Sequence, residues 1–177
     1  EAGVKYVSPD ESLGISAAYF DITQENRVSD GNTPGGVEQT GAVIDGWELQ
    51  VNKRWQRFET QLAYTDLNAR DDASGNRLPY VAERQASWWN QLYIANNWRV
   101  GAGVRYVGDN VGSGGGPVVP SVTLYDAMIG YTWQNWDFTV DAKNLADDEY
   151  ITWCRSEGAD CGYGERRTVN ANAKYRF

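Results

Sequence analysis

The chain has 177 residues, a formal net charge of −8 and a hydrophobic content of 41%. Its mean hydropathy is only −0.59, and no stretch approaches the ~18 consecutive apolar residues that a membrane helix requires. The acidic balance argues against a nucleic-acid partner, because phosphate binding needs clustered Lys and Arg. The 0 His residues remove the commonest general base and most protein zinc sites. We therefore expect no enzyme, no catalytic residues and no metal site.

The aromatic content points to an interface between apolar and wet surroundings. The chain has 8 Trp and 11 Tyr against a single Met. Trp and Tyr suit positions such as a membrane interface, where a ring has one apolar and one wet end. With 19 Gly and only 5 Pro, the composition favours strands and turns over disorder.

Nine segments are predicted as strands. In the last of them, Arg167 to Phe177, apolar and polar residues alternate strictly, as in a strand with one apolar and one polar face. Trp88 and Trp89 blur the faces of another. In chain order the nine segments are 2–7, 12–23, 43–54, 58–67, 84–95, 98–106, 124–133, 136–143 and 167–177.

The connections between these segments alternate in length. Tight turns are expected at 8–11, 55–57, 96–97 and 134–135, and long polar, Gly-rich segments at about 24–41, 68–83, 107–120 and 154–164. Outer-membrane barrels have short periplasmic turns and long extracellular loops. A soluble β-sandwich is the alternative, but its loops need not alternate in length. We predict an all-β fold: about nine antiparallel strands of a transmembrane β-barrel, an odd number that does not close by itself.

Several segments resemble one family. Asn144 to Tyr150 resembles the N-L-x-D-x-x-Y motif of TonB-dependent outer-membrane receptors, and Gly164 to Phe177 resembles their terminal strand. Gly103 to Gly108 and Val119 to Ala127 resemble the segments G-V-R-Y-x-G and V-P-x-Y-T-x-x-D-A. The cysteine pair in the last long loop, followed by a Gly-x-Gly, is most similar to the ferrichrome, or hydroxamate-siderophore, receptor branch.

This resemblance implies a fold and a function. Residues 1–177 would be the C-terminal segment of a barrel of 22 strands when complete, without its plug domain and earlier strands. The receptor would take up a ferric siderophore, hydroxamate type favoured, with energy from the TonB complex acting through the absent plug domain, and would bind no cofactor covalently. It would lie in the cell outer membrane of a Gram-negative bacterium, among lipid and lipopolysaccharide. A receptor for cobalamin, another metal chelate or a glycan stays open, as does a passive porin.

The last long loop holds the candidate site. Cys154 and Cys161 flank six residues, and in an oxidising compartment we expect them to form a local disulfide. Trp153, Arg155 and Tyr163 surround that pair, and aromatic walls with an Arg suit a wrapped siderophore complex. The alternative is that these residues belong to the outer aromatic girdle. Arg155 stands where the ferrichrome receptor has an aromatic residue, which suits a siderophore with an anionic group.

Two further features have plain structural interpretations. Charges on the polar strand faces, including Arg99, Arg105 and Asp137, are expected to pair with each other or with the plug. Gly112 to Gly116 lacks the Lys-Ser/Thr and the following helix of a phosphate-binding loop, so we interpret it as a flexible loop tip.

Overall fold

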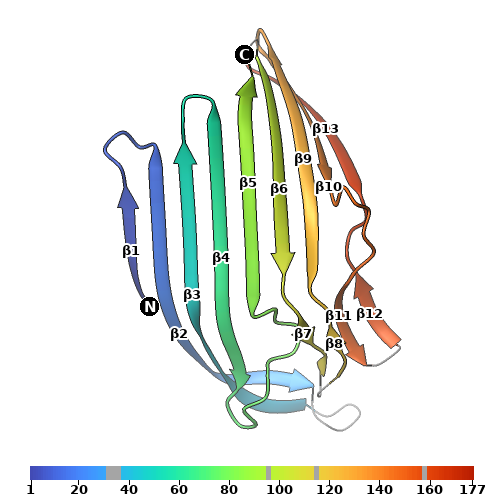
Figure 1. Cartoon of the computed structure of the whole chain (residues 1–177). Coiled ribbons are helices and arrows are strands. Elements are labelled where there is room, and N and C mark those ends of the chain that lie inside the picture. The colour runs from blue at the N-terminus through green and yellow to red at the C-terminus, as the bar shows by residue number, and fades with distance from the viewer. Residues whose placement is uncertain (31–36, 95–96, 114–115, 157–158) are drawn as a thin grey trace.

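The computed structural model of the chain describes residues 1–30, 37–94, 97–113, 116–156 and 159–177. In these residues nine strands form one antiparallel sheet in the order β1-β2-β3-β4-β5-β6-β9-β10-β13 (Figure 1). The prediction of an all-β fold with nine antiparallel strands is therefore confirmed. Within the same residues there is no helix of sufficient length and apolarity to cross a membrane.

Each strand of the sheet pairs with the next sheet strand along the chain, and two small hairpins lie in the connections. The sheet strands are β1 (Ala2–Val7), β2 (Leu13–Asp30), β3 (Val37–Arg54), β4 (Phe58–Asp71), β5 (Arg84–Ile94), β6 (Trp98–Val107), β9 (Val122–Trp133), β10 (Trp136–Lys143) and β13 (Thr168–Tyr175). The hairpins are β7 (Asn110–Val111) with β8 (Val118–Val119), and β11 (Ile151–Ser156) with β12 (Ala159–Tyr163).

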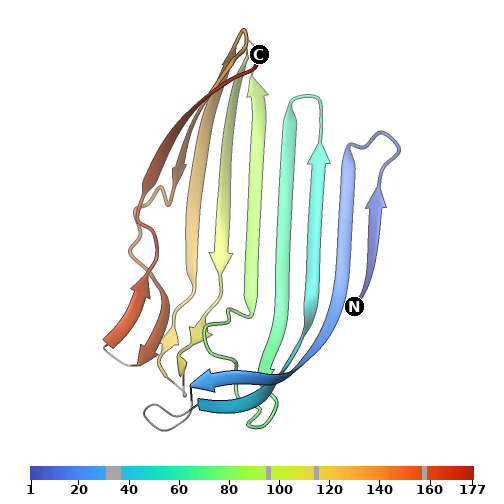
Figure 2. The same cartoon turned by 180° about the vertical axis from the view of Figure 1, so that it is seen from behind.

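The two ends of the curved sheet differ, as the connection lengths predicted. Figures 1 and 2 show the tight turns and the C-terminus at one end, and the long connections with both hairpins at the other. We call these the turn end and the loop end. Strands β1 and β13 are the sheet edges, so the sheet is open, as expected for part of a barrel.

The register confirms the alternation of faces. One row of paired residues is apolar across six strands: Phe58, Leu92, Val100, Ile129, Val140 and Ala171. The next row, offset by one residue, is Arg99, Gly130, Thr139 and Asn172. Because successive residues of a strand point to opposite faces, one face of the sheet is apolar and the other polar. Leu92, Ile129 and Val140 are 44%, 45% and 42% exposed, as side chains that face lipid would be in an isolated chain.

Strand β5, in which Trp88 and Trp89 obscured the alternation of the sequence, also has two distinct faces. Trp88 is paired with Leu62 and Val104 on the apolar side. The ring of Trp89 lies against the backbone of Gly101 and Gly103, where a Cβ at Gly103 would come within 2.5 Å of Trp89 Cε3. The two glycines therefore make room for an indole ring on the polar face.

Regular structure extends further toward the loop end than the sequence predicted. The segment expected to be loop, 24–41, is mostly the outer part of β2 and β3, although residues 31–36 lie outside the described part of the chain. A register shift between Gln24 and Arg27, with φ 57° at Asn26, marks where the pair bends. β4 likewise continues to Asp71. The alternation of apolar and polar residues does not reveal these outer segments, because they are mostly polar. A hairpin surrounded by water needs paired backbone groups but no apolar face.

Candidate functional site at the loop end

Three connections that are distant in the sequence meet at the loop end. They are residues 72–83 between β4 and β5, the β7–β8 hairpin and the β11–β12 hairpin, which together we call the loop cluster. The Tyr80 N–H donates to the carbonyl of Val111 at 2.8 Å, and Asn110 Nδ2 donates to the carbonyl of Thr152 at 3.1 Å. The Tyr80 and Trp153 rings meet edge to face, with centroids 6.1 Å apart. These contacts therefore join the three connections of the loop cluster to one another.

Cys154 and Cys161 form the expected disulfide. They lie directly opposite each other on β11 and β12, so the bond crosses the hairpin from strand to strand. Cys154 is only 5% exposed, because the β7–β8 hairpin covers this part of β11. The disulfide holds the hairpin closed at the point where it contacts the rest of the loop cluster.

Two of the three predicted ligand-binding residues share a face of the β11–β12 hairpin. Trp153 is paired with Gly162, and its ring lies in the space that a Cβ at Gly162 would occupy. Arg155 is two residues further along the same strand and therefore on the same face. Tyr163, 66% exposed, follows Gly162 directly and points to the opposite face. The hairpin thus brings Trp153 and Arg155 together and separates Tyr163 from them.

Arg155 already has an acidic partner. Its Nη1 lies 3.2 Å from Oδ2 of Asp160, and the two side chains are 61% and 51% exposed. Asp160, in β12, has φ 57°, a left-handed conformation that Asp tolerates better than most residues. An ion pair this exposed contributes little free energy, so Arg155 can exchange Asp160 for another anion. The anionic-cargo interpretation stays a prediction.

The glycine-rich segment after β7 is packed against the disulfide hairpin. A Cβ at Gly112 would lie 2.5 Å from the carbonyl oxygen of Cys154, and one at Gly116 would lie 2.9 Å from that of Arg155. Both contacts are with backbone, so no side-chain movement relieves them. The interpretation of 112–116 as a flexible loop tip does not account for this packing at Gly112 and Gly116, while residues 114–115 lie outside the described residues. Glycine at these two positions lets the segment lie close to the backbone of the disulfide hairpin.

Two residues of the loop cluster were missed by the sequence reasoning. Tyr80 is 42% exposed and has φ 66°. Asn110 is 5% exposed, and its Oδ1 has no hydrogen-bond partner among the described residues. Tyr80 lies in a stretch, Leu78 to Trp89, that resembles the receptor family, but its left-handed conformation is not visible in the sequence. The role of Asn110 depends on a contact 42 residues away. Only the neighbouring Pro79 signalled a turn.

Ion pairs support the base of the loop cluster. Arg77 Nη1 lies 2.8 Å from Asp109 Oδ2, and Arg77 Nε lies 3.3 Å from Glu83 Oε2. Arg70 pairs with the same Glu83. Hydrogen bonding from Arg77 holds the pKa of Asp109 below its ordinary value. These contacts join the β4–β5 connection to the segment that enters β7.

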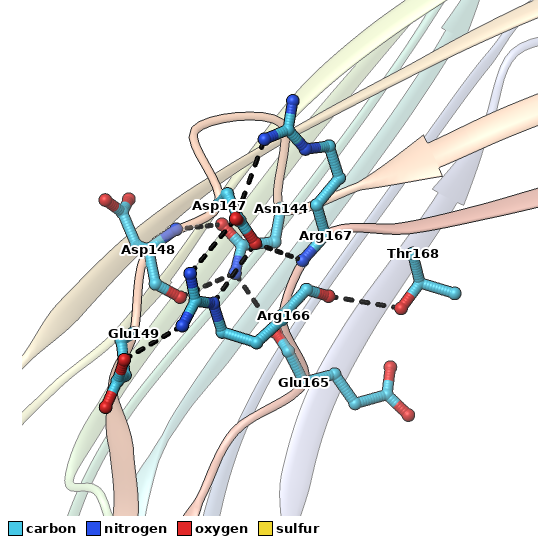
Figure 3. A network of polar contacts seen from close by, with 8 residues as sticks. All are labelled: Asn144, Asp147, Asp148, Glu149, Glu165, Arg166, Arg167 and Thr168. Carbon is cyan, nitrogen blue, oxygen red and sulfur yellow. Dashed lines mark hydrogen bonds and ion pairs between the residues drawn. The ribbon is translucent and has the colours of Figure 1, made fainter.

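The N-L-x-D-x-x-Y segment forms a polar clamp with the start of β13 (Figure 3). Asn144, 2% exposed, has φ 51°. Its Nδ2 donates to the carbonyls of Asp148 at 2.8 Å and Glu165 at 3.0 Å, and its Oδ1 accepts from the Asp148 N–H at 2.9 Å. One buried amide therefore ties the segment that leaves β10 to the segment that enters β13.

Asp147 supplies the charged half of this clamp. Its carboxylate accepts from Arg166 Nε and Nη2 at 3.1 and 3.0 Å and from the Arg167 N–H at 2.9 Å (Figure 3). Hydrogen bonding from Arg166, and then from the Arg167 backbone, lowers the pKa of Asp147 to about 2. We use the name clamp for Asn144, Asp147, Arg166 and Arg167. It closes the base of the β11–β12 hairpin, which lies between its two halves.

The charged side chains on the polar face of the sheet pair with each other, as expected. Arg99 Nη2 lies 2.7 Å from Asp137 Oδ1, and Arg105 Nε lies 2.5 Å from Asp126 Oδ2. Asp126 also accepts from the Asn144 N–H at 3.0 Å. The clamp is thereby connected to the wall of the sheet.

An open, curved antiparallel sheet with one apolar face, tight turns at one end and braced loops at the other is the wall of an outer-membrane β-barrel. Residues 1–145 match the family described as TonB dependent receptor-like, beta-barrel. The chain belongs to the β-barrel family of TonB-dependent receptors. That membership places it in the outer membrane of a Gram-negative cell, as predicted.

Relatives in this family are named as siderophore receptors. The chain is 32% identical over 192 residues to the catecholate siderophore receptor Fiu of Escherichia coli (strain UTI89 / UPEC), covering 100% of the chain and 25% of that protein. It is 28% identical to the ferrioxamine receptor of Yersinia enterocolitica, covering 100% of the chain and 27% of the receptor. The crystal structure of Fiu from E. coli K12 in its closed form matches with a TM-score of 0.80 at 27% identity, over 99% of this chain and 27% of that one. The chain thus spans about a quarter of the length of the relatives it matches.

Proposed function

We propose that this chain supplies wall and extracellular loops to a receptor that takes up a ferric siderophore with TonB-coupled energy. The observation that carries the proposal is the braced loop cluster, which presents Trp153 and Arg155 on one face of a disulfide-closed hairpin. Rigid aromatic anchors beside an adaptable charge suit the capture of a compact, mostly apolar complex. The relatives named as siderophore receptors support the cargo class.

The siderophore class is the finer part of this proposal. The cysteine-bracketed loop favours a hydroxamate, and the relatives include the ferrioxamine receptor and the ferrichrome outer membrane transporter/phage receptor of E. coli. They also include the catecholate receptor Fiu. We propose a hydroxamate cargo, with the catecholate as the competing outcome of the test.

Other partners follow from the same proposal. In this proposal the TonB complex acts through a plug domain that lies outside these residues. The uncovered apolar face, with Leu92, Ile129 and Val140 exposed, would contact outer-membrane lipid, and the outer loops would lie near lipopolysaccharide.

Uptake of radioactive iron tests this proposal. An iron-starved strain without its own siderophore receptors would express the receptor that carries this chain and receive ferrichrome, ferrioxamine B or a ferric tris-catecholate. We expect saturable uptake of one hydroxamate complex that disappears when TonB is deleted. Uptake of the catecholate alone would change the class. Uptake of cobalamin or a glycan, or passage that is independent of TonB, would overturn the siderophore proposal.

A further inference from the structure

Tyr80 is the conformational exception of the chain. In the described residues, eight non-glycine residues have positive φ, and seven of them are Asn, Asp, Glu or Gln. The eighth is Tyr80, with φ 66°. The left-handed region crowds Cβ against the backbone, and short polar side chains such as Asn are several-fold enriched there, whereas a bulky residue is an outlier.

The backbone around Tyr80 is anchored by its neighbours. Leu78 is 4% exposed, and its N–H donates to the carbonyl of Ala69 at 2.9 Å. On the other side, Val81 packs on the same apolar cluster as Leu78. The Tyr80 N–H itself donates to the carbonyl of Val111. These anchors involve no atom of the Tyr80 side chain, so they can hold the turn with another residue at position 80.

The described residues leave Tyr80 partly uncovered. It is 42% exposed, and Trp153 beside it is 37% exposed. The two rings stand at 82° to each other, so together they form an apolar corner with two walls. One wall comes from the β4–β5 connection and the other from the disulfide hairpin. The two rings supply apolar surface, and Arg155 on the same hairpin is held in an exposed ion pair with Asp160.

We propose that Tyr80 is a specificity-determining residue of the loop cluster, whose ring forms with Trp153 a corner that contacts ring or methylene surface of the siderophore. This inference rests on the proposed function. Asn or Gly would adopt the same backbone with less strain, and strained residues persist where the side chain has a use that the surrounding structure supports. The corner would contact the organic part of the chelator rather than its iron-binding oxygens.

Two substitutions at position 80 and one distant control test this inference. The receptor as the cell makes it would be purified with Tyr80→Asn, Tyr80→Phe or Gln134→Asn. Gln134 has φ 51° in the β9–β10 turn at the opposite end of the sheet, so its replacement relieves the same kind of strain away from the loops. The heat-unfolding midpoint would be measured, together with Kd for ferrichrome, ferrioxamine B and a ferric tris-catecholate.

We expect Tyr80→Asn to unfold at the same temperature as wild type or higher, and yet to bind its siderophore about tenfold more weakly, the loss of one aromatic anchor. Tyr80→Phe keeps the ring and should bind within about twofold of wild type. Gln134→Asn should gain stability without any change in Kd. Unchanged Kd in Tyr80→Asn overturns the inference, and so does weaker binding accompanied by a lower unfolding temperature. If the wild type binds none of the three complexes, the proposed function fails first, and the inference fails with it.

Discussion

The two ends of the sheet are closed in different ways. At the turn end, the turns at 8–11 and 55–57 have short-range contacts of their own, beside contacts between neighbouring turns such as Lys53 with Ser12. Ser8 Oγ donates to Asp10 Oδ1 at 2.6 Å, and the Trp55 N–H donates to the carbonyl of Phe58 at 2.7 Å. At the loop end the contacts join distant segments, such as Tyr80 with Trp153. The turn-end contacts join neighbouring turns and strands, whereas the loop-end contacts join three connections that are distant in the sequence.

The ends also differ in chemistry. The turn end carries ring pairs, with Trp98 and Tyr131 centroids 4.6 Å apart and Trp136 and Tyr175 centroids 5.0 Å apart. Such a belt of aromatic residues suits the level of the lipid headgroups. The loop end has ion pairs, a disulfide and glycines in close contact with backbone. On the proposed function, we expect the turn end to lie at the membrane interface and the loop end to contact the cargo.

Removing the buried amide of the clamp should have the largest effect on stability. Asn144→Ala leaves the carbonyls of Asp148 and Glu165 and one N–H without their partner, and Ala tolerates positive φ poorly. We expect a loss of about 3 kcal/mol in the free energy of unfolding. Urea unfolding in detergent measures it.

The matched control for that prediction is Asn170→Ala. Asn170 is exposed, and its side chain donates to Asp141 at 3.1 Å. We expect a change within about 0.5 kcal/mol. An equal effect of the two substitutions would contradict the assignment of Asn144 as the buried centre of the clamp.

Removing the disulfide should have a smaller and local effect. In the doubly substituted variant Cys154→Ala, Cys161→Ala, the hairpin loses a short cross-link worth about 2 kcal/mol. Because the bond lies within one hairpin, we expect hydrogen exchange in 151–156 and 159–163 to accelerate while the sheet unfolds at an unchanged urea concentration. Val118→Ala, on the facing hairpin and 63% exposed at that side chain, is the control. Simultaneous loss of sheet stability would show that the hairpin also supports the wall.

The stability that the charged half of the clamp contributes should depend on pH. The pKa of Asp147 falls from 3.8 to about 2 because of Arg166 and the Arg167 backbone. A lowered folded-state pKa adds stability that is fully present above about pH 4 and is lost as the pH falls through about 2. Asp147→Asn should therefore lower the heat-unfolding midpoint by a few degrees at pH 7, and the gap to wild type should close near pH 2.

Asp148→Asn is the control for the pH experiment. Asp148 contributes its backbone N–H and carbonyl to the clamp, and in Figure 3 its carboxylate points away from the two arginines. We expect this variant to follow the wild type at every pH. A gap between Asp147→Asn and wild type that persists at pH 2 would assign the stability to packing rather than to the ion pair.

The contrast between the two ends also explains what the sequence could predict. Strand alternation and local turns depend on neighbouring residues. The nine strands, and the alternation of short and long connections, could therefore be predicted from Arg167 to Phe177 and similar segments. The disulfide followed from two cysteines close in sequence. The clamp motif was recognised, but its partner Arg166 is 19 residues from Asp147, and the pairing needs the fold.

The site was predicted only in part for the same reason. Trp153 and Arg155 were recognised by their position beside Cys154. Tyr163 was placed with them by proximity in sequence, and strand alternation turns it to the other face. Tyr80 was missed because its exposure depends on a left-handed turn fixed by distant anchors. Loop-end residues meet through tertiary contacts that no local pattern encodes.

Siderophore binding by two tryptophan variants tests most directly whether the loop end, and not the turn end, contacts the cargo. Trp153, at the loop end, is 37% exposed, and Trp133, at the turn end, is 51% exposed. Each would be replaced by Ala in the receptor as the cell makes it, and Kd would be measured for the siderophore that the uptake experiment identifies. We predict that Trp153→Ala weakens binding about tenfold and that Trp133→Ala leaves Kd unchanged. Equal Kd values for the two variants would contradict the account.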